Sequence, residues 1–123
     1  MSAENCLFCR IGRAEVPSEK VFEDDSILAF HDIHPAAPVH FLIIPKSHVD
    51  SLLTSGPEHQ AVLGKMVALA PRLAKEQGCD NGFRLVINNG PDGGQEVNHL
   101  HIHILGGPRP WKRRRPRCSF RSA

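Results

Sequence analysis

The chemistry in this sequence is concentrated between residues 97 and 105, where three histidines alternate with aliphatic residues as His99-Leu-His101-Ile-His103-Ile. Strict alternation of polar and apolar residues is typical of a β-strand, so residues 97–105 are predicted to form one. The three imidazoles then lie on one face, about 6.7 Å apart, and the aliphatic side chains enter the core. A buried imidazole needs hydrogen bonds for both ring nitrogens, so three on one face indicate a functional site.

An imidazole can attack phosphorus when one ring nitrogen is unprotonated and a fixed acceptor holds the other. With an ordinary pKa of about 6.5, roughly three quarters of such rings are neutral at pH 7, so no metal is needed for the attack. His101 is the candidate nucleophile, because a histidine on either side can orient it and stabilise charge on phosphoryl oxygens. Glycine-rich residues 88–94 precede it, and they fit either a phosphate-binding loop or an ordinary turn.

The elements that must position these histidines follow from periodicity and from turn residues. They define an α+β fold, an antiparallel sheet with one long and one short helix. The short helix is predicted at 6–12 and the long one from the 55–58 capping-box pattern to Gly78, with Pro71 as a kink or break. Strands are predicted at 21–23, 27–32, 40–44 and 83–87, the first two joined by a turn at 24–26.

The composition indicates a single domain followed by a basic tail. The chain has 123 residues, of which 41% are hydrophobic and 23% charged, as in an ordinary globular protein. A domain over 1–107 and a disordered, proline-rich tail over 108–123 are expected, with nucleic-acid binding by the tail as an alternative. The tail holds a cluster of cations: Lys112, Arg113, Arg114, Arg115, Arg117 and Arg121. The chain has no leader-like or membrane-spanning run, so a cytoplasmic location without membrane contact is expected.

Several further segments, together with the three histidines, make the sequence similar to the histidine triad superfamily and, within it, to the nucleotide-binding branch. The strand matches the pattern in which histidine and apolar residues alternate three times. The similarity runs from about Cys6 to Gly107. The other matching segments are Asp32, Ala37-Pro38-Val39-His40, Ile43-Ile44-Pro45-Lys46 and Gly93-Gly94-Gln95.

The resemblance implies a homodimer whose sheet continues across both subunits, and an enzyme that hydrolyses purine nucleoside 5′-phosphoramidates or acyl-adenylates through a nucleotidyl-histidine intermediate. The catalytic residues would be His101 as nucleophile, with His103, His40 and His99. Asp32 would bind the ribose hydroxyls, and Asn88 and Gln95 would lie near the phosphate. The other implied nucleotide-binding residues are Phe8, Ile11, Val16, Phe30, His31, Ile33, Leu42, Gly94, Glu96 and Val97.

Two residues depart from the family pattern next to the histidines. Glu96 stands where animal members carry serine, although bacterial members often carry glutamate, and Asn98 replaces a usual aromatic residue. An ionised carboxylate donates no hydrogen bond to a leaving group, so the rate and leaving-group preference are not carried over. The tail after Gly107 also has no counterpart in the family's C-terminal end, so substrate choice is not inherited from there.

Cys6 and Cys9 have the Cys-x-x-Cys spacing of a zinc site, which two further ligands would complete. The resemblance implies that His48 and His99 supply them, giving a structural Zn²⁺ that catalysis does not require. Free thiols and a redox pair are the alternatives, although a redox pair normally accompanies a βαβ pattern that is absent from the prediction.

Three other functions are consistent with the same residues. One is a dinucleoside polyphosphate hydrolase or nucleotidyl transferase that uses the same triad. Another is a metal-dependent hydrolase with the three histidines as ligands, although their spacing along one strand makes a shared ion difficult. The third is a purine-nucleotide-binding module without turnover.

Overall fold

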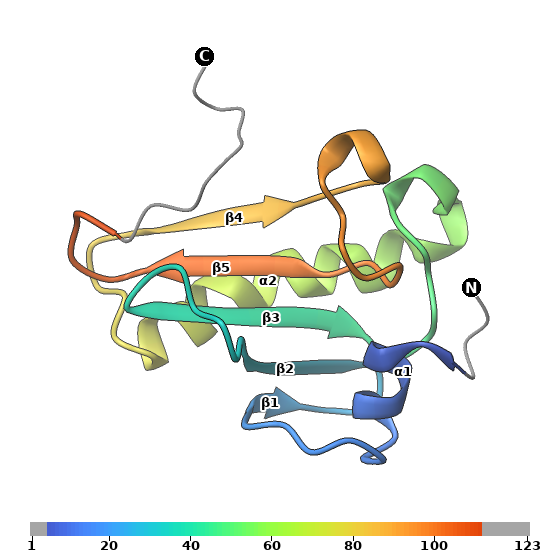
Figure 1. The fold of residues 1–123 in the computed structure, drawn as a ribbon, viewed down its shortest axis with the longest axis horizontal. Helices are drawn as coiled ribbons and strands as arrows, with labels where there is room; N and C mark the ends of the chain where they lie inside the picture. The colour runs from blue at the N-terminus through green and yellow to red at the C-terminus, as the bar shows by residue number, and fades with distance from the viewer. Residues whose placement is uncertain (1–4, 112–123) are drawn as a thin grey trace.

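The sheet is antiparallel and has five strands in the order β1-β2-β3-β5-β4 (Figure 1). The structure is a computed structural model, and it describes residues 5–111. The predicted α+β class with an antiparallel sheet is confirmed. The strands are β1 (Lys20–Glu23), β2 (Ile27–His31), β3 (Val39–Pro45), β4 (Phe83–Ile87) and β5 (Ile102–Gly106).

The two helices lie on opposite faces of this sheet, the long α2 behind it and the short α1 in front of it in Figure 1. Their bounds are α1 (Leu7–Gly12) and α2 (Gln60–Glu76), as predicted a short helix and a long one. Short 3₁₀ turns connect the elements at η2 (Leu52–Thr54), η3 (Pro57–His59) and η4 (Pro91–Gly93). No helix in residues 5–111 is both long enough and apolar enough to cross a membrane.

Alternation along the central strands divides the core in two. Phe41 and Ile43 of β3 point toward α2 and form the first core with Met66 and Leu73 of that helix. Leu42 of β3 faces the other way, into a second core that also holds Leu28, Phe30 and Ile44, with Phe8, Cys9 and Ile11 of α1. Because successive strand residues point to opposite faces, each helix covers one set. The second core is the floor of the histidine site.

The turn between β1 and β2 forms as predicted. The Asp24 side chain accepts hydrogen bonds from the backbone N–H groups of Ser26 and Ile27, at 2.9 and 2.8 Å. A short acidic side chain that bonds to the backbone two or three residues ahead is the expected turn chemistry. Lys65 of α2 forms an ion pair with the same carboxylate, which ties the turn to the helix.

The long helix begins later than its capping-box pattern predicted, and it is not divided at Pro71. Ser55 donates to the Leu52 carbonyl at 3.0 Å, and His59 accepts from the Gly56 N–H at 2.9 Å, so Ser55 and Glu58 do not form the box. The turn η3 therefore precedes α2. The helix then runs through Pro71 to Glu76 without interruption.

The predicted strand over 97–105 is wrong in its first half, because β5 begins only at Ile102. The backbone before it bonds elsewhere: His99 N–H donates to the Val97 carbonyl at 2.8 Å, and Leu100 N–H donates to the Val49 carbonyl at 2.7 Å. The alternation of faces is nevertheless kept. Leu100 and Ile102 enter the core under α2, whereas His99 and His101 contact Phe8 on the other side.

The basic tail lies almost entirely outside the described residues, which end at Trp111. Its four described residues, 108–111, turn back on Gly107, because the Trp111 indole N–H donates to the Gly107 carbonyl at 3.0 Å. The Arg109 guanidinium lies over the Trp111 ring, 4.2 Å from its centroid. The disorder and nucleic-acid binding expected of the tail over 108–123 fall mainly on residues 112–123, which lie outside this range.

Candidate active site and metal centre

His101 is buried, and one of its ring nitrogens is held by the backbone. Its Nδ1 lies 2.7 Å from the carbonyl oxygen of His99. A carbonyl only accepts, so Nδ1 carries the proton and Nε2 of the neutral ring keeps its lone pair. Burial lowers the pKa of His101, against the raising effects of the His99 carbonyl, Asp32 and Glu96. The ring is therefore neutral at pH 7 and has one unprotonated nitrogen.

His103 and His40 lie beside it and form a second hydrogen-bonded unit. The His101 and His103 rings are 4.9 Å apart between centroids, and His40 Nε2 is 3.0 Å from His103 Nδ1. The Ala36 N–H donates to His40 Nδ1 at 3.0 Å, so a neutral His40 carries its proton on Nε2. That proton faces His103 Nδ1 and also Asp32 Oδ2, which is 3.4 Å away. A neutral His103 that accepts this proton on Nδ1 carries its own proton on Nε2.

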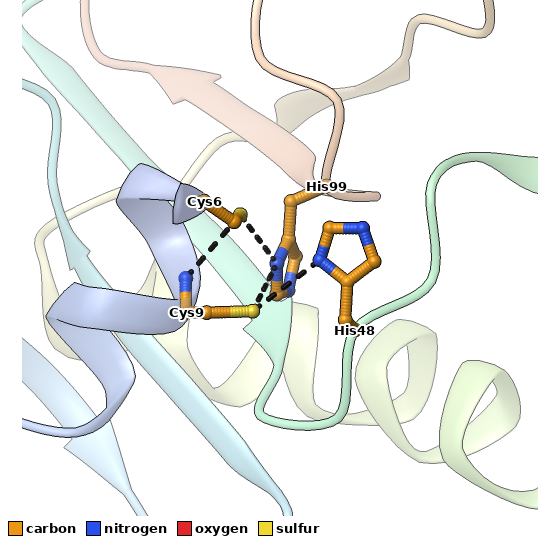
Figure 2. A group of neighbouring side chains, drawn as sticks. All are labelled: Cys6, Cys9, His48 and His99. Atoms are coloured by element: carbon orange, nitrogen blue, oxygen red, sulfur yellow. Dashed lines mark hydrogen bonds between the residues drawn. The ribbon is translucent and has the colours of Figure 1, made fainter. Parts of the chain in front are cut away.

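The side chain of His99 belongs to a different cluster, which it forms with Cys6, Cys9 and His48 (Figure 2). Its Nδ1 lies 3.3 Å from Cys6 Sγ and 3.4 Å from Cys9 Sγ. His48 Nδ1 lies 3.3 Å from Cys9 Sγ. The four potential ligand atoms lie within 4.8 Å of one another, so α1, the segment after β3 and the segment before β5 meet at this point.

The cluster has the chemistry of a Cys2His2 metal centre. His99 Nε2 donates to the Pro45 carbonyl at 2.8 Å and His48 Nε2 to Asp50 Oδ1 at 2.6 Å, which leaves both Nδ1 lone pairs facing the sulfurs. Tetrahedral zinc bonds of about 2.3 Å to sulfur and 2.0 Å to nitrogen would separate these ligands by roughly 3.5 Å. The observed separations are close to that value. A carboxylate behind a ligating histidine is also a usual arrangement.

The ionisation of the cluster also matters for metal binding. Burial and the neighbouring Cys6 raise the pKa of Cys9 to about 11, and burial lowers the pKa of His99 to about 4. At neutral pH the metal-free centre therefore holds a neutral imidazole and a protonated Cys9 thiol. A thiolate is the form that ligates, so binding an ion would release a proton.

Asp32, His40 and His103 also lie within 4.8 Å of one another and could in principle hold an ion. Their hydrogen bonds argue against it. A metal on His40 Nε2 would move the remaining ring proton to Nδ1, where it would face the Ala36 N–H, so two donors would oppose each other. The three predicted triad histidines also do not converge on one ion, since His99 points to the cysteines. This geometry argues against the metal-dependent hydrolase that uses the three histidines as ligands.

The glycine-rich loop is folded on itself and does not present its amides as a phosphate cradle. Gly93 and Gln95 N–H groups both donate to the Gly90 carbonyl, each at 3.1 Å, and Gly94 N–H donates to Pro91 at 3.1 Å. The side chain of Gln95, which the family resemblance places near the phosphate, forms its hydrogen bonds with other groups of the protein. Its amide nitrogen donates to the Asp50 and Val97 carbonyls at 2.7 and 2.9 Å, and its oxygen accepts from Gly90 N–H.

The residues expected to bind the nucleotide form two groups. Phe8, Ile11, Phe30 and Leu42 are buried in the second core, with Val16 and Val97 packed against them. His31, Asp32 and Ile33 lie at the end of β2, where the Ile33 side chain is 85% exposed. Asp32 Oδ1 accepts from the His34 N–H at 2.8 Å.

Three other predicted nucleotide-binding residues lie around the histidine segment. Asn88 directly follows β4, whose last residue Ile87 pairs with Ile102, next to His101. Gly94 has a left-handed backbone with φ of 77°, and Glu96 is exposed. Of the three, Glu96 is close enough to His101 for its charge to raise the pKa of that ring.

Three participants were not foreseen from the sequence: the backbone groups of Ala36 and His99, and the Asp50 carboxylate behind His48. A backbone donor or acceptor leaves no signature in residue type, so the first two have no sequence signal. For Asp50, the signal was its position two residues after a candidate ligand.

The chain belongs to the HIT family: the HIT domain model matches residues 13–109. Its fold and its histidines agree with this membership. Among curated proteins, it is 53% identical over 105 residues to "Protein HitA" of Neisseria gonorrhoeae, covering 85% of this chain and 98% of the relative. It is 43% identical over 106 residues to the purine nucleoside phosphoramidase of Escherichia coli K12, covering 85% and 89%.

Solved structures give the same result. A histidine triad protein from Clostridium difficile has a TM-score of 0.84 and 46% identity, over 89% of this chain and 96% of that one. A HIT family hydrolase from Legionella pneumophila has a TM-score of 0.83 and 46% identity, over 85% and 95%. The relatives thus include hydrolases, and the fold expected from the resemblance is confirmed.

Proposed function

We propose that this protein hydrolyses the P–N bond of purine nucleoside 5′-phosphoramidates, or the acyl-phosphate bond of acyl-adenylates, through a nucleotidyl-histidine intermediate on His101. The observation that carries the proposal is the 2.7 Å hydrogen bond from His101 Nδ1 to the His99 carbonyl. That bond fixes the tautomer in which Nε2 is a nucleophile. The name of the Escherichia coli relative, a purine nucleoside phosphoramidase, supports the substrate class.

In the first step, the Nε2 lone pair of His101 attacks the α-phosphorus and forms an N–P bond. The P–N bond to the amine breaks, and the amine leaves with its electron pair and takes up a proton from solvent, which the attack of water in the second step returns. Because Nδ1 keeps its proton, the phosphorylated ring is cationic, and the His99 carbonyl and the Asp32 and Glu96 charges favour that cation. Water then attacks phosphorus, so that AMP is released and the neutral imidazole is restored.

The other histidines stabilise charge on the phosphoryl oxygens. The chain of hydrogen bonds from Ala36 through His40 to His103 sets the proton of a neutral His103 on Nε2, where an N–H can stabilise a phosphoryl oxygen. We propose that this group and the His40 edge contact the phosphate. The base would bind near exposed Ile33 and His31, with Asp32 toward the ribose and Asn88 toward the phosphate. Gln95 would act by holding the 90–97 loop, since its amide groups already bond within the protein.

We propose that Zn²⁺ occupies the Cys2His2 centre of Cys6, Cys9, His48 and His99. Two observations support that choice: the matched S–N separations, and the hydrogen bonds from the two ligand histidines to the Pro45 carbonyl and the Asp50 carboxylate. When bound, zinc would supply structural cross-linking and no Lewis-acid chemistry, because the ligand set is complete without a water and His101 is not in it.

We also propose a homodimer in which β4 pairs with the β4 of a second copy. The sheet order leaves β1 and β4 as edges. The β1 edge is four residues long, carries Lys20 and Glu23 at its ends and has a bulge, which are protections against pairing. The β4 edge is five residues long and apolar apart from Arg84. We further propose that residues 1–107 form a single domain.

The test is turnover of adenosine 5′-phosphoramidate by the wild type and by His101→Ala, with intact-protein mass spectrometry after rapid quenching. We expect the wild type to release AMP and to show a transient adenylyl adduct. His101→Ala should bind AMP but lose at least about 10³-fold in kcat. His59→Ala, a histidine at the start of α2, is the matched control and should keep activity. AMP binding without turnover by the wild type would instead identify a nucleotide-binding module.

A further inference from the structure

His99 is shared between the metal centre and the nucleophile. Its imidazole is fully buried, with Nδ1 on the Cys6 and Cys9 sulfurs and Nε2 on the Pro45 carbonyl. Its main-chain carbonyl is the acceptor that fixes the His101 tautomer, at 2.7 Å. Only Leu100 separates the two histidines. A shift of the His99 side chain therefore moves the atom on which the reactive state of His101 depends.

A second connection runs through α1. Phe8 lies between Cys6 and Cys9 in the sequence, and its ring meets the His101 ring edge-on, with centroids 5.1 Å apart and planes at 89°. It also contacts the His99 ring at 5.9 Å. Figure 2 shows Cys6, which caps this helix, and Cys9, which lies within it, both turned toward His99. The two thiols that hold the centre thus also set the position of a ring packed on the nucleophile.

A third connection runs through the segment after β3. Asp50 accepts a hydrogen bond from the ligand His48 through its carboxylate and one from the Gln95 amide through its backbone carbonyl. Gln95 also donates to Val97, two residues before His99. The segment that leads into the histidines is therefore also connected to the centre, through Asp50 and Gln95.

We propose that occupancy of the Cys2His2 centre controls the reactivity of His101. With all four ligands bound to a divalent metal of the zinc class, His99 and Phe8 are fixed, and His101 is held with its proton on Nδ1. Without the ion, two thiols and two imidazoles no longer have a common bonding partner. The His99 carbonyl then loosens and part of the His101 population exchanges its tautomer. His99 is thus a positioning residue, and the ion takes no part in bond making or breaking.

The expected size of the effect follows from comparable arrangements. Loss of a partner that orients a ligand or a catalytic group typically costs about 10- to 100-fold. The buried positions of Phe8, Cys9 and Ile11 in the second core keep α1 attached when the ion is absent, so the fold should survive. The predicted outcome is therefore a slower enzyme with an intact sheet.

The experiment uses the full chain, labelled with ¹⁵N at histidine, as zinc-loaded, chelator-stripped and zinc-restored samples. Two-bond ¹H–¹⁵N correlation spectra report which nitrogen of each imidazole carries the proton. We expect a single Nδ1–H form of His101 in the loaded protein, a mixture in the stripped protein, and recovery on restoring zinc. In parallel, the stripped protein should cleave adenosine 5′-phosphoramidate with a kcat about 10- to 100-fold lower than that of the zinc-loaded protein. Its Kd for AMP should differ from that of the loaded protein by less than about threefold.

Matched variants separate control of His101 from general damage. His48→Asn removes a ligand that lies outside both α1 and the histidine segment, and it should reproduce the tautomer mixture. Cys79→Ala removes a buried cysteine outside the centre and should leave the His101 signals unchanged. If stripping unfolds the protein, His48→Asn decides: a folded variant with a single Nδ1–H form overturns the proposal.

The inference rests on the proposed function only for its kinetic part. If the zinc-loaded protein does not cleave the phosphoramidate, the proposed hydrolase fails, yet the spectra still show whether the centre governs His101. If the metal is removed completely and both the tautomer and kcat stay as they were, the control proposal fails and the hydrolase stands.

Discussion

At the scale of single residues, the site depends on which nitrogen of each imidazole carries a proton. Four histidines have this settled by a fixed neighbour: His101 by the His99 carbonyl, His40 by the Ala36 N–H, His99 by Pro45 and His48 by Asp50. Two tautomers result. Nδ1 is protonated in His101, whereas Nδ1 is the free lone pair in His99 and His48. Neighbouring histidines of identical type are thereby given different chemistry.

Activity should persist into acid because the attacking form of His101 is neutral. Burial lowers the pKa of this ring, so the neutral form should remain dominant at pH values where an ordinary histidine, with pKa about 6.5, is already protonated. We expect kcat/KM to be flat from about pH 8 through 6.5 and to fall only below that. A pH profile of phosphoramidate cleavage measures this. A fall centred at or above pH 6.5 would contradict it.

The stability of the metal-free protein should also decrease in acid. The pKa of His99 is lowered to about 4 by burial, so below about pH 6.5 the unfolded chain binds a proton that the folded chain does not. The free energy of unfolding should therefore fall between about pH 6.5 and 4, by up to about 3 kcal/mol, and this term should be constant below pH 4. Urea unfolding of stripped protein at several pH values tests it, with His99→Gln as the variant that should lose the slope.

At the scale of elements, sequence periodicity predicted the order of helices and strands well, because buried apolar residues recur along each main element at the spacing of its buried face. The failures occurred where backbone bonding overrides periodicity. Residues 97–101 alternate like a strand, yet Leu100 donates to Val49 outside the sheet. The capping-box pattern at 55–58 was replaced by η3 because His59 takes the Gly56 N–H. In the site, side-chain types revealed the histidines and cysteines, but not the backbone groups that orient them.

The β1–β2 turn gives a prediction for one element. Replacing Asp24 with alanine removes the acceptor of the Ser26 and Ile27 amides, and about 1 kcal/mol of stability should be lost. The Lys65 ion pair and the same amides lower the pKa of Asp24 to about 2. The wild type should thus be more stable than Asp24→Ala above about pH 4, and this difference in stability should be lost as pH falls toward 2. Thermal unfolding of both proteins at pH 7 and near pH 2 measures it; equal stabilities at pH 7 would contradict the role.

At the end of β5, Gly106 packs against Cys79 in the connection between α2 and β4, which leaves no room for a side chain. A Cβ added at Gly106 would lie 2.3 Å from Cys79 Sγ and 3.2 Å from its Cβ. Gly106→Ala should therefore destabilise the protein by about 1–3 kcal/mol. Combining it with Cys79→Ala should recover part of that loss. A double-mutant cycle by chemical denaturation measures the coupling, and simple additivity of the two changes would show that the contact is not the cause.

At the scale of the whole molecule, the open β4 edge predicts association. Size-exclusion chromatography with light scattering should give twice the chain mass of 13.6 kDa. Val86→Glu places a charge on the edge strand, and two copies brought together would repel, so the mass should shift toward the monomer. Lys20→Glu, on the opposite edge, is the control and should keep the dimer. A monomeric wild type at micromolar concentration would rule out the β4 pairing.

The Cys2His2 centre joins the two ends of the folding unit, since Cys6 and His99 are 93 positions apart in the chain. Closing so long a loop has an entropic cost that grows with its length. On a ribosome, the two thiols emerge first and the last ligand only after nearly all of the domain has been made. The centre can therefore close only on a chain that has reached its histidine segment. Capture of the ion proposed for this centre would thus mark completed synthesis, and a truncated product would keep two unligated thiols.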